Sequence, residues 1–317
     1  RVKIGCVLPL TGPEDRHARS QLLAVRLALE ETERASPLPF AVELVVKDDE
    51  MDAERSAEIA EEFVADQEIM AVIGPMNSKT SLSAAPIFHR GGLAHIATAA
   101  SNPTLTKNGW HTFFRVVCND VHQYREAAGF AVKKLGARRI AVVYGAGGTF
   151  SGPMAEGFRQ VATELGAEIP VFLAVQGAKD DYSDEIAVLA TTQCDLIFFI
   201  VGESTAVVLA RQLRESGVMV PFFATDGLKP FPYFATWDYP VEGPYYTNVC
   251  ADPQVKAPAG EMVRRYMERF GEEPTVYMAE AYDAARIILE ALRGISSSLP
   301  TRQEVCQAIA ETKGFPG

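Results

Sequence analysis

The chain alternates short apolar segments with amphipathic ones over most of its length, and this alternation restricts the folds that it can adopt. Strand-length apolar segments, the first at residues 2–8, are each followed by a stretch with apolar residues at helical spacing. In the first such stretch, residues 18–34, Leu22, Val25 and Leu29 fall on one helical face. A series of strand–helix–strand steps forces parallel strands with helices on both faces of the sheet. The sequence therefore predicts an α/β fold.

The series runs twice along the chain. The first run ends near residue 117, and the second begins with a helix expected at 121–135 and continues to about residue 250. A length of 317 residues also exceeds what one hydrophobic core usually supports. We predict two doubly wound parallel-sheet lobes joined by a multi-strand hinge. Lobe 1 is expected to comprise residues 1–117 and 251–317, and lobe 2 residues 118–250.

The composition narrows the functional classes. Hydrophobic residues make up 48% and charged residues 22% of the chain, which are ordinary values for a globular protein. The net charge of −11 argues against a nucleic-acid-binding surface, and no cluster of lysines and arginines offsets it. No apolar run approaches the roughly 18 residues of a membrane span. The first residues, Arg1-Val2-Lys3, lead directly into a strand, which indicates either a cytoplasmic protein or a mature form whose leader has been removed.

Hydroxyl side chains follow two of the predicted strands. The two segments are Ile73-Gly-Pro-Met-Asn-Ser78, where we expect Ser78 to be the N-cap of a helix, and Ala97-Thr-Ala-Ala-Ser-Asn-Pro103, which contains Ser101. In an open parallel sheet, ligands bind outside the carboxyl ends of the strands. A helix N-terminus at that edge attracts a carboxylate. The sequence therefore predicts a pocket for a small anionic or zwitterionic molecule.

The usual markers of catalysis are absent from the sequence. The motifs GxxxxGK[ST], GxSxG and HExxH do not occur, and the cysteines show no metal-binding spacing. The loop at residues 145–150 lacks the third glycine of a dinucleotide-binding loop, so a plain turn is favoured over nucleotide binding. We expect no cofactor, no metal and no catalytic residue.

Two further side chains are candidates for the predicted pocket. His17 follows the first strand and could line the same edge as the two serines. Asp226 follows a strand of the second series, where it is either a turn former within Thr-Asp-Gly or a counter-ion for an ammonium group. Four other residues are interpreted as structural: His89, His95, Cys6 and Cys194.

A set of short motifs, in this order and spacing, resembles a known family. They are Lys3-Ile-Gly-Cys-Val-Leu-Pro-Leu-Thr-Gly-Pro13, Lys47-Asp-Asp49, Ile73-Gly-Pro75, Ser101-Asn-Pro-Thr-Leu-Thr106, Phe114-Arg115, Asp226-Gly227 and Ala281-Tyr-Asp-Ala284. Over nearly its whole length the chain resembles the type I periplasmic binding proteins, specifically the leucine/isoleucine/valine-binding group.

The resemblance implies a site for both charged ends of an amino acid. Ser78 and Ser101 match the hydroxyl positions that hold the carboxylate, and Ala99 matches the backbone carbonyl that receives the ammonium group. The acidic partner of the ammonium group in the second lobe falls on Asp226. The aromatic pocket positions of the family fall on two residues, Phe150 and Tyr277.

The chain departs from the family pattern along the wall of this site. Phe150 replaces the usual tyrosine, and His17 stands where an aromatic residue is common. Met76 and Asn77 alter the wall of the first lobe, and the tyrosine-rich position of the second lobe falls near Glu203. These departures bear on which ligand side chain is accepted.

The cysteines also depart from the family pattern. Its characteristic disulfide pair falls on Met51 and Asn77, so that bridge is absent. Cys118 and Cys250 are both expected on segments that cross between the lobes, and a disulfide between them is a hypothesis. The family continues through a third crossing to the second lobe past the position at which this sequence stops, Gly317.

The resemblance implies an extracytoplasmic solute-binding protein of an ABC importer rather than an enzyme. It is expected to bind a branched-chain or related amino acid by hinge closure, and to meet a membrane permease in the periplasm or outside the cell. One alternative is a ligand-sensing module of a receptor or regulator. Another is a binding protein for a small carboxylate without an amine, such as an aromatic acid.

Overall fold

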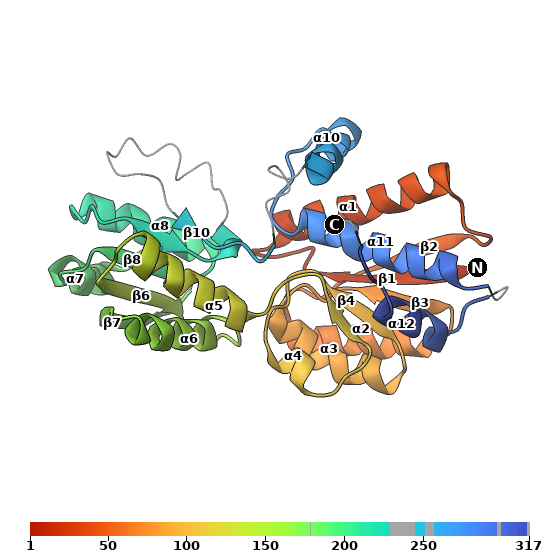
Figure 1. Ribbon diagram of the computed structural model, residues 1–317, viewed down its shortest axis with the longest axis horizontal. Helices are drawn as coiled ribbons and strands as arrows, with labels where there is room; N and C mark the ends of the chain where they lie inside the picture. Colours follow the sequence, from red (N-terminus) through yellow and green to blue (C-terminus); the bar gives the residue numbers. More distant parts are fainter. Residues whose placement is uncertain (178, 229–244, 251–256, 297–298, 316–317) are drawn as a thin grey trace. The chain divides into compact units, whose positions relative to one another are not determined.

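The computed structural model describes residues 1–177, 179–228, 245–250, 257–296 and 299–315. The chain divides into two compact units, unit 1 from Arg1–Cys118 with Cys250–Gly317 and unit 2 from Asn119–Val249. Each unit contains one parallel sheet with helices on both faces (Figure 1). The predicted α/β fold with two doubly wound parallel sheets is therefore confirmed.

Unit 1 alternates strands and helices from its N-terminus. Its elements are β1 (Val2–Leu8), α1 (Asp15–Ala35), β2 (Val42–Asp48), α2 (Ala53–Ala65), β3 (Ile69–Ile73), α3 (Ser78–Arg90), β4 (Ala94–Ala97), α4 (Thr104–Lys107), β5 (Phe113–Arg115), α10 (Ala257–Phe270), α11 (Met278–Gly294) and α12 (Arg302–Ala310). The strand order is β2-β1-β3-β4-β5, and all described pairs are parallel. In this doubly wound order, β2 is added on one side of β1 and the later strands on the other, so the direction in which the sheet grows switches between β1 and β3.

Unit 2 repeats that arrangement. Its elements are α5 (Asp120–Gly129), η1 (Phe130–Lys134), β6 (Arg139–Gly145), α6 (Ser151–Glu164), β7 (Glu168–Val175), α7 (Ser183–Thr191), β8 (Leu196–Ile200), α8 (Glu203–Glu215), β9 (Phe222–Ala224), η2 (Asp226–Leu228) and β10 (Tyr245–Tyr246). The strand order, β7-β6-β8-β9-β10, matches that of unit 1 when the strands are counted from β6. Both units therefore present the same kind of sheet edge to a ligand.

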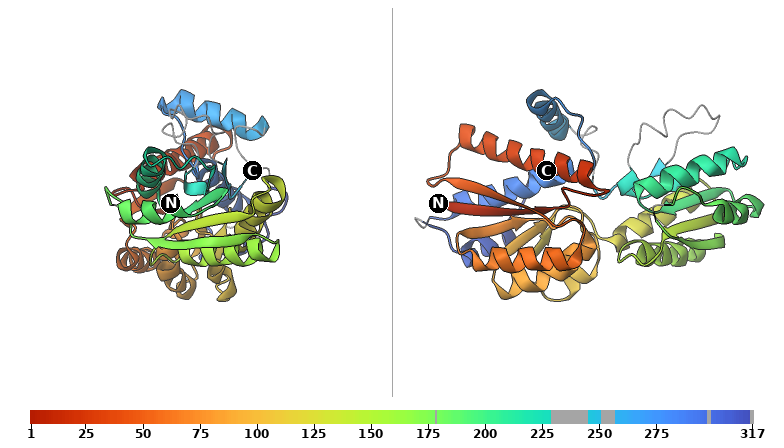
Figure 2. Two further views of the ribbon diagram at one scale, coloured as in Figure 1. Left: turned by 90° about the vertical axis from the view of Figure 1, so that its left-hand side faces the viewer. Right: turned by 180° about the vertical axis from the view of Figure 1, so that it is seen from behind.

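Alternation along β1, which pairs with β2 on one side and β3 on the other, places one core on each face of the unit 1 sheet. Ile4, Cys6 and Leu8 of β1 pack with α1 and α11, whereas Val7 packs with α2 and α3. Figures 1 and 2 show α1 and α11 side by side on one face, with α2 and α3 on the other. This two-residue period is the one that a strand buried on both faces requires.

The unit 2 sheet is covered in the same way. The residues of α5, η1 and α6 pack against one face, which includes Phe198 and Phe223, and those of α7 and α8 pack against the other, which includes Phe199. The Phe198 and Phe223 rings stack with their centroids 4.8 Å apart.

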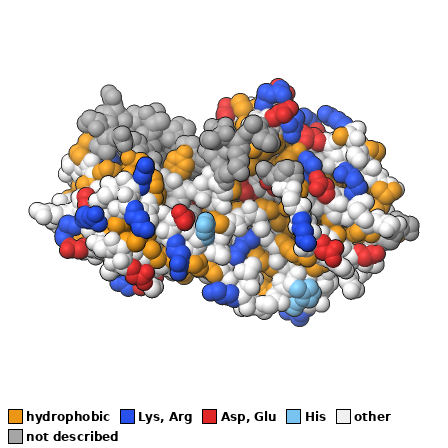
Figure 3. Space-filling model, viewed as in Figure 1, with side chains coloured by type: hydrophobic (Ala, Val, Ile, Leu, Met, Phe, Trp, Pro, Cys, Tyr) orange, Lys and Arg blue, Asp and Glu red, His pale blue; other side chains and the backbone are white. Residues whose placement is uncertain are grey.

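Ion pairs attach α10 to α1 within unit 1. Arg265 Nε donates to Glu31 Oε1 and Arg269 Nε to Glu30 Oε2, each at 2.7 Å. Elsewhere, charged side chains of both signs are interspersed on the face that Figure 3 shows. Within the described residues, no helix is long and apolar enough to cross a membrane.

Three element boundaries differ from the sequence prediction. The first helix starts at Asp15, not at residue 18, so His17 lies inside its first turn rather than in a loop. The helix predicted at 121–135 is α-helical only to Gly129. It continues as the π-helical turn η1, in which Leu135 N donates to Phe130 O five residues earlier. The prediction that Ser78 caps α3 is wrong. Asn77 occupies the N-cap position with extended backbone angles, and Ser78 is the first helical residue.

Candidate ligand-binding site

The predicted site residues lie at the carboxyl edges of the two sheets. In unit 1, α3 begins just after β3 with Ser78, and Ala99 and Ser101 follow β4. In unit 2, the predicted site residues Phe150, Glu203 and Asp226 follow β6, β8 and β9, respectively. These are the edges at which doubly wound sheets bind ligands.

Backbone geometry holds the exits of β1 and β3 together in unit 1. Gly74 has φ of +95°, and a Cβ atom built on it would lie 2.1 Å from the carbonyl oxygen of Val7. Its N–H donates to Ile96 O of β4 at 2.8 Å. Only glycine fits here, so the turn that leads into α3 is set by the close approach of β1.

The two serines occupy neighbouring, largely buried positions. Ser78 is 7% exposed and Ser101 is 4% exposed. Ser78 Oγ accepts a hydrogen bond from Asn102 N at 3.2 Å, which joins the start of α3 to the segment after β4. The N-terminal N–H groups of the 13-residue helix α3 lie at the same place. The edge therefore combines hydroxyl groups with the positive end of a helix dipole, as an anion site requires.

A buried amide lies beneath this edge. Gln21 of α1 is fully buried; its Nε2 donates to Met76 Sδ at 2.8 Å, and its Oε1 accepts from Thr98 Oγ1 at 2.5 Å. Met76, expected on the pocket wall, is 1% exposed and belongs to the core of unit 1. Met76 therefore does not line a pocket wall; it packs in the core beneath the edge, where its sulfur accepts the hydrogen bond from Gln21.

The other unit 1 candidates take three different positions. His17 is 4% exposed in the first turn of α1. Asn77 is half-buried, and its buried Oδ1 has no hydrogen-bond partner among the described residues. Tyr277, at the N-cap of α11, is half-buried and has φ of +65°, in the left-handed region that non-glycine residues seldom adopt. Strained backbone of this kind is concentrated at functional sites.

Two consecutive carboxylates end β2 at the same edge. Asp48 accepts hydrogen bonds from Thr11 Oγ1 at 2.7 Å and Leu10 N at 2.8 Å. Burial raises the pKa of Asp48, but these bonds outweigh it and leave the pKa below its ordinary value. Asp49 is fully buried, and burial raises its pKa to about 6. Asp48 thus fixes the loop after β1, while Asp49 is a buried acid.

Asp226 opens the short helix η2 at the exit of β9 and is 5% exposed. Its Oδ1 accepts a hydrogen bond from Gln123 Nε2, and the same nitrogen donates to Thr247 Oγ1 at 2.8 Å. Gln123 is 2% exposed on α5. The carboxylate of unit 2 is therefore a buried acceptor held by a neutral amide.

Gln123 is not among the site residues predicted from the sequence. One signal was available, since Gln123, Ala127 and Ala131 recur at the four-residue spacing of one helical face, and both alanines are buried. A polar residue on an otherwise apolar face needs a buried partner. The identity of that partner, more than 100 residues later, has no local signature.

Phe150 and Glu203 stand at the starts of two helices of unit 2. Phe150 is the N-cap of α6 and packs, half-buried, against the core beside α5. Glu203 is the first residue of α8, where a carboxylate favours the helix dipole. Both residues are partly accessible at the carboxyl edge of the sheet.

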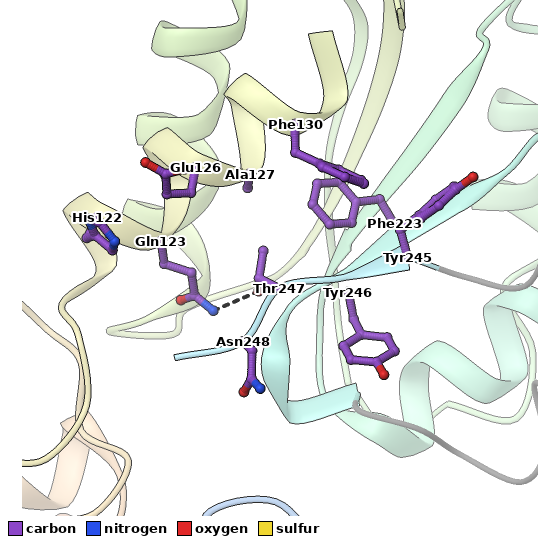
Figure 4. A pocket seen from close by; sticks show the side chains of 10 residues that line it. All are labelled: His122, Gln123, Glu126, Ala127, Phe130, Phe223, Tyr245, Tyr246, Thr247 and Asn248. Atoms are coloured by element: carbon purple, nitrogen blue, oxygen red, sulfur yellow. Dashed lines mark hydrogen bonds between the residues drawn. The ribbon is translucent and has the colours of Figure 1, made fainter. Parts of the chain in front are cut away.

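A cavity of about 440 Å³ lies beside Gln123 in unit 2 (Figure 4). Gln123 and Thr247 line it, together with an aromatic group of Phe130, Phe223 and Tyr245. The Phe130 ring centroid is 5.6 Å from that of Tyr245 and 5.7 Å from that of Phe223. This cavity adjoins the amide of Gln123 but is not lined by Asp226.

The cysteines form no disulfide in the structure. All five are thiols, Cys118 and Cys250 included, so the bridge hypothesised between these two is not formed. Cys250 Sγ instead donates to Glu280 Oε1 at 2.6 Å. Cys6 is fully buried as predicted, whereas Cys194 is only half-buried. In the described part of the chain, no group of three or more His, Cys, Asp or Glu side chains could hold a metal ion.

Comparison with known proteins identifies the family. A family model described as periplasmic binding protein matches residues 1–317. The chain belongs to the periplasmic binding protein family. Membership places this periplasmic binding protein among solute-binding proteins rather than enzymes, and among proteins that act outside the cytoplasm.

Curated relatives are similar over almost the whole chain. The Leu/Ile/Val-binding protein homolog 1 of Brucella melitensis is 25% identical over 320 residues, which cover 99% of this chain and 83% of that protein. An amino acid binding protein of Pseudomonas aeruginosa is 24% identical and covers 95% of this chain and 80% of its own length.

Solved structures share the fold. The leucine binding protein LivK of Thermotoga maritima has a TM-score of 0.89 at 27% identity, covering 99% of this chain and 89% of that one. A solute binding protein of R. palustris in complex with benzoate has a TM-score of 0.85 at 17% identity, covering 98% and 86%.

Proposed function

We propose that this periplasmic binding protein is the substrate-binding subunit of an ABC importer and that it binds a branched-chain or related amino acid. The observation that carries the proposal is the buried carboxylate of Asp226 at the carboxyl edge of one sheet, together with the buried serine hydroxyls at the carboxyl edge of the other. A ligand that meets both needs a positive and a negative end. The relatives named for leucine, isoleucine and valine support the same choice.

In this proposal, unit 1 holds the carboxylate of the amino acid. Ser78 and Ser101 donate hydrogen bonds from their hydroxyl groups, and the first N–H groups of α3 add the field of the helix N-terminus. The carbonyl oxygen of Ala99 accepts a hydrogen bond from the ammonium group. Asn77 and His17 border the same edge.

Unit 2 supplies the ionic partner of the ammonium group. Asp226 is an acceptor of low exposure, so an ammonium group placed against it loses water and must be paired to be stable there. Phe150, Tyr277 and Glu203 are proposed to contact the rest of the ligand. An acid without an amine would leave Asp226 without this partner.

Because each unit holds one end of the ligand, binding favours the arrangement in which both units contact it. Ligand-driven hinge closure of this kind is a standard conformational switch. The closed form would then be recognised by the membrane permease, in the periplasm or outside the cell. No chemical step is part of the cycle.

A calorimetric titration tests the proposal. The purified chain is titrated with L-leucine, L-isoleucine and L-valine, and with 4-methylpentanoate, which is leucine without its amine, and with benzoate. We expect at least one amino acid to bind, and 4-methylpentanoate to bind much more weakly than leucine. Binding of benzoate without any amino acid would replace the proposal with a carrier of aromatic acids.

A further inference from the structure

We infer that Gln123 is a positioning residue for ligand binding. It fixes the carboxylate of Asp226 for the ammonium group. This inference rests on the proposed function, because it assigns a role in the same site.

The chemistry of the two side chains fixes the orientation of the amide. An ionised carboxylate only accepts hydrogen bonds, so the atom of Gln123 that faces Asp226 Oδ1 must be Nε2. The Nε2 group has two protons, and its second acceptor is Thr247 Oγ1 at 2.8 Å (Figure 4). Both protons therefore have acceptors, and a flipped amide would set its carbonyl oxygen against the carboxylate.

The backbone of Gln123 is also held in place. Asn119 caps α5, and its side-chain oxygen accepts from His122 N at 3.2 Å. Gln123 N donates to the backbone oxygen of Asn119 at 3.2 Å. The side chain thus extends from the capped first turn of a helix and is 2% exposed. Few alternative rotamers are open to a side chain so buried.

This orientation of the Gln123 amide leaves one of its polar atoms without a hydrogen bond. Gln123 Oε1 is buried and has no hydrogen-bond partner among the described residues. Leaving a buried carbonyl oxygen unpaired is unfavourable. The unpaired oxygen is a consequence of the orientation in which Nε2 bonds both Asp226 and Thr247.

A neutral donor suits an ammonium site better than a cation would. A lysine or arginine in this position would pair with Asp226 and cancel the charge that the ligand needs. An amide restricts the rotation of the carboxylate and brings no charge of its own to the site. Loss of the amide should therefore weaken binding of an amino acid only as long as Asp226 is present.

A double-mutant cycle tests this dependence. The affinity for leucine, or for the amino acid that binds best, is measured in the wild type, Gln123→Met, Asp226→Ala and the double variant. Methionine keeps the length of the side chain but donates no hydrogen bond. We expect Gln123→Met to raise the Kd about tenfold or more in the wild-type background, as for a hydrogen bond to a charged group. In the Asp226→Ala background we expect a change of less than about twofold, because the amide no longer has a carboxylate to position.

Two further variants make the result specific. Gln160→Met is the matched control and should bind as the wild type does. Gln160 lies on an exposed face of α6, and among the described residues its side chain bonds only Glu164. Thr247→Val removes the second acceptor of the amide and should raise the Kd in the same direction by a smaller factor. It provides the test if Gln123→Met does not fold.

Equal losses of affinity in both backgrounds would mean that Gln123 acts on the fold rather than through Asp226, and would overturn the inference while leaving the proposed function intact. A wild-type chain that binds no amino acid would overturn the proposed function and this inference together.

Discussion

The buried carboxyl group of Asp49 provides a quantitative test of the structure of unit 1. It lies at the end of β2 with no exposed surface, accepts a hydrogen bond from Met51 N at 3.2 Å, and has one buried oxygen, Oδ2, without a partner among the described residues. Burial raises its pKa from 3.8 to about 6. We predict that Asp49→Asn stabilises unit 1 at pH 8 and has little effect at pH 4.

The size of this stabilisation follows from the coupling between protonation of Asp49 and folding. Well below the unfolded-state pKa of 3.8 the group carries a proton in both the folded and the unfolded state, so it contributes no pH dependence there. Between pH 4 and about 6 the unfolded state releases its proton first, and stability falls as the pH rises. A pKa difference of about two units corresponds to about 3 kcal/mol above pH 6. The asparagine amide also needs hydrogen-bond partners, so we expect a net gain of about 1–3 kcal/mol at pH 8.

The neighbouring residue Asp48 is a matched control of opposite sign. Its pKa is lowered, so its contribution to stability is present above the unfolded-state pKa and is lost as the pH falls through the folded-state pKa. Asp48→Asn should therefore destabilise unit 1 at pH 8. Urea unfolding followed by Trp110 fluorescence, in a Trp237→Phe background, reports on unit 1 because Trp110 packs there. An Asp49→Asn variant that gains nothing at pH 8, or gains equally at pH 4 and pH 8, would refute the reasoning.

Two other predictions concern the same unit. His95 is fully buried between Phe88 and Phe113, and burial lowers its pKa to about 3. Below about pH 6.5 the unfolded state binds a proton at this imidazole that the folded state does not, so the folded state loses stability as the pH falls. His95→Phe should make the unfolding free energy less dependent on pH between 6.5 and 4, and an unchanged acid-unfolding midpoint, measured by circular dichroism, would count against this. The guanidinium of Arg302 donates to five backbone carbonyls, those of Phe63, Val64, Asp66, Ile69 and Gly91. Arg302→Met should cost about 2–4 kcal/mol in urea unfolding, and Arg302→Lys should recover only part of this because lysine lacks the planar set of donors.

The fold could be predicted from the sequence because its signals are local. β1 is a short, mostly apolar run, apolar residues recur at helical spacing in α1, and short turns separate such segments along both units. The sites of Ser78, Ser101 and Asp226 could be placed at sheet edges for the same reason, since a residue just after a parallel strand must lie at its carboxyl end.

The details of the edges could not be predicted, because they depend on contacts between distant residues. Gln21 and Met76 are 55 residues apart, and Gln123 and Asp226 are 103 residues apart. Nothing near Met76 in the sequence indicates that its sulfur accepts a hydrogen bond within the core. Likewise, Ser78 has a residue type suited to capping, but Asn77 before it is equally suited and takes that position.

The central claim is that Asp226 pairs with the ammonium group of an amino acid. The most direct test is calorimetric titration of leucine, or of the amino acid that binds best, into the wild type and into Asp226→Ala. If the ammonium group is left buried without its partner, binding should weaken by about 2–5 kcal/mol, a rise in Kd from about thirtyfold to several thousandfold. A Kd of Asp226→Ala within about threefold of the wild-type value would contradict the claim, since 1.4 kcal/mol already corresponds to about a tenfold change.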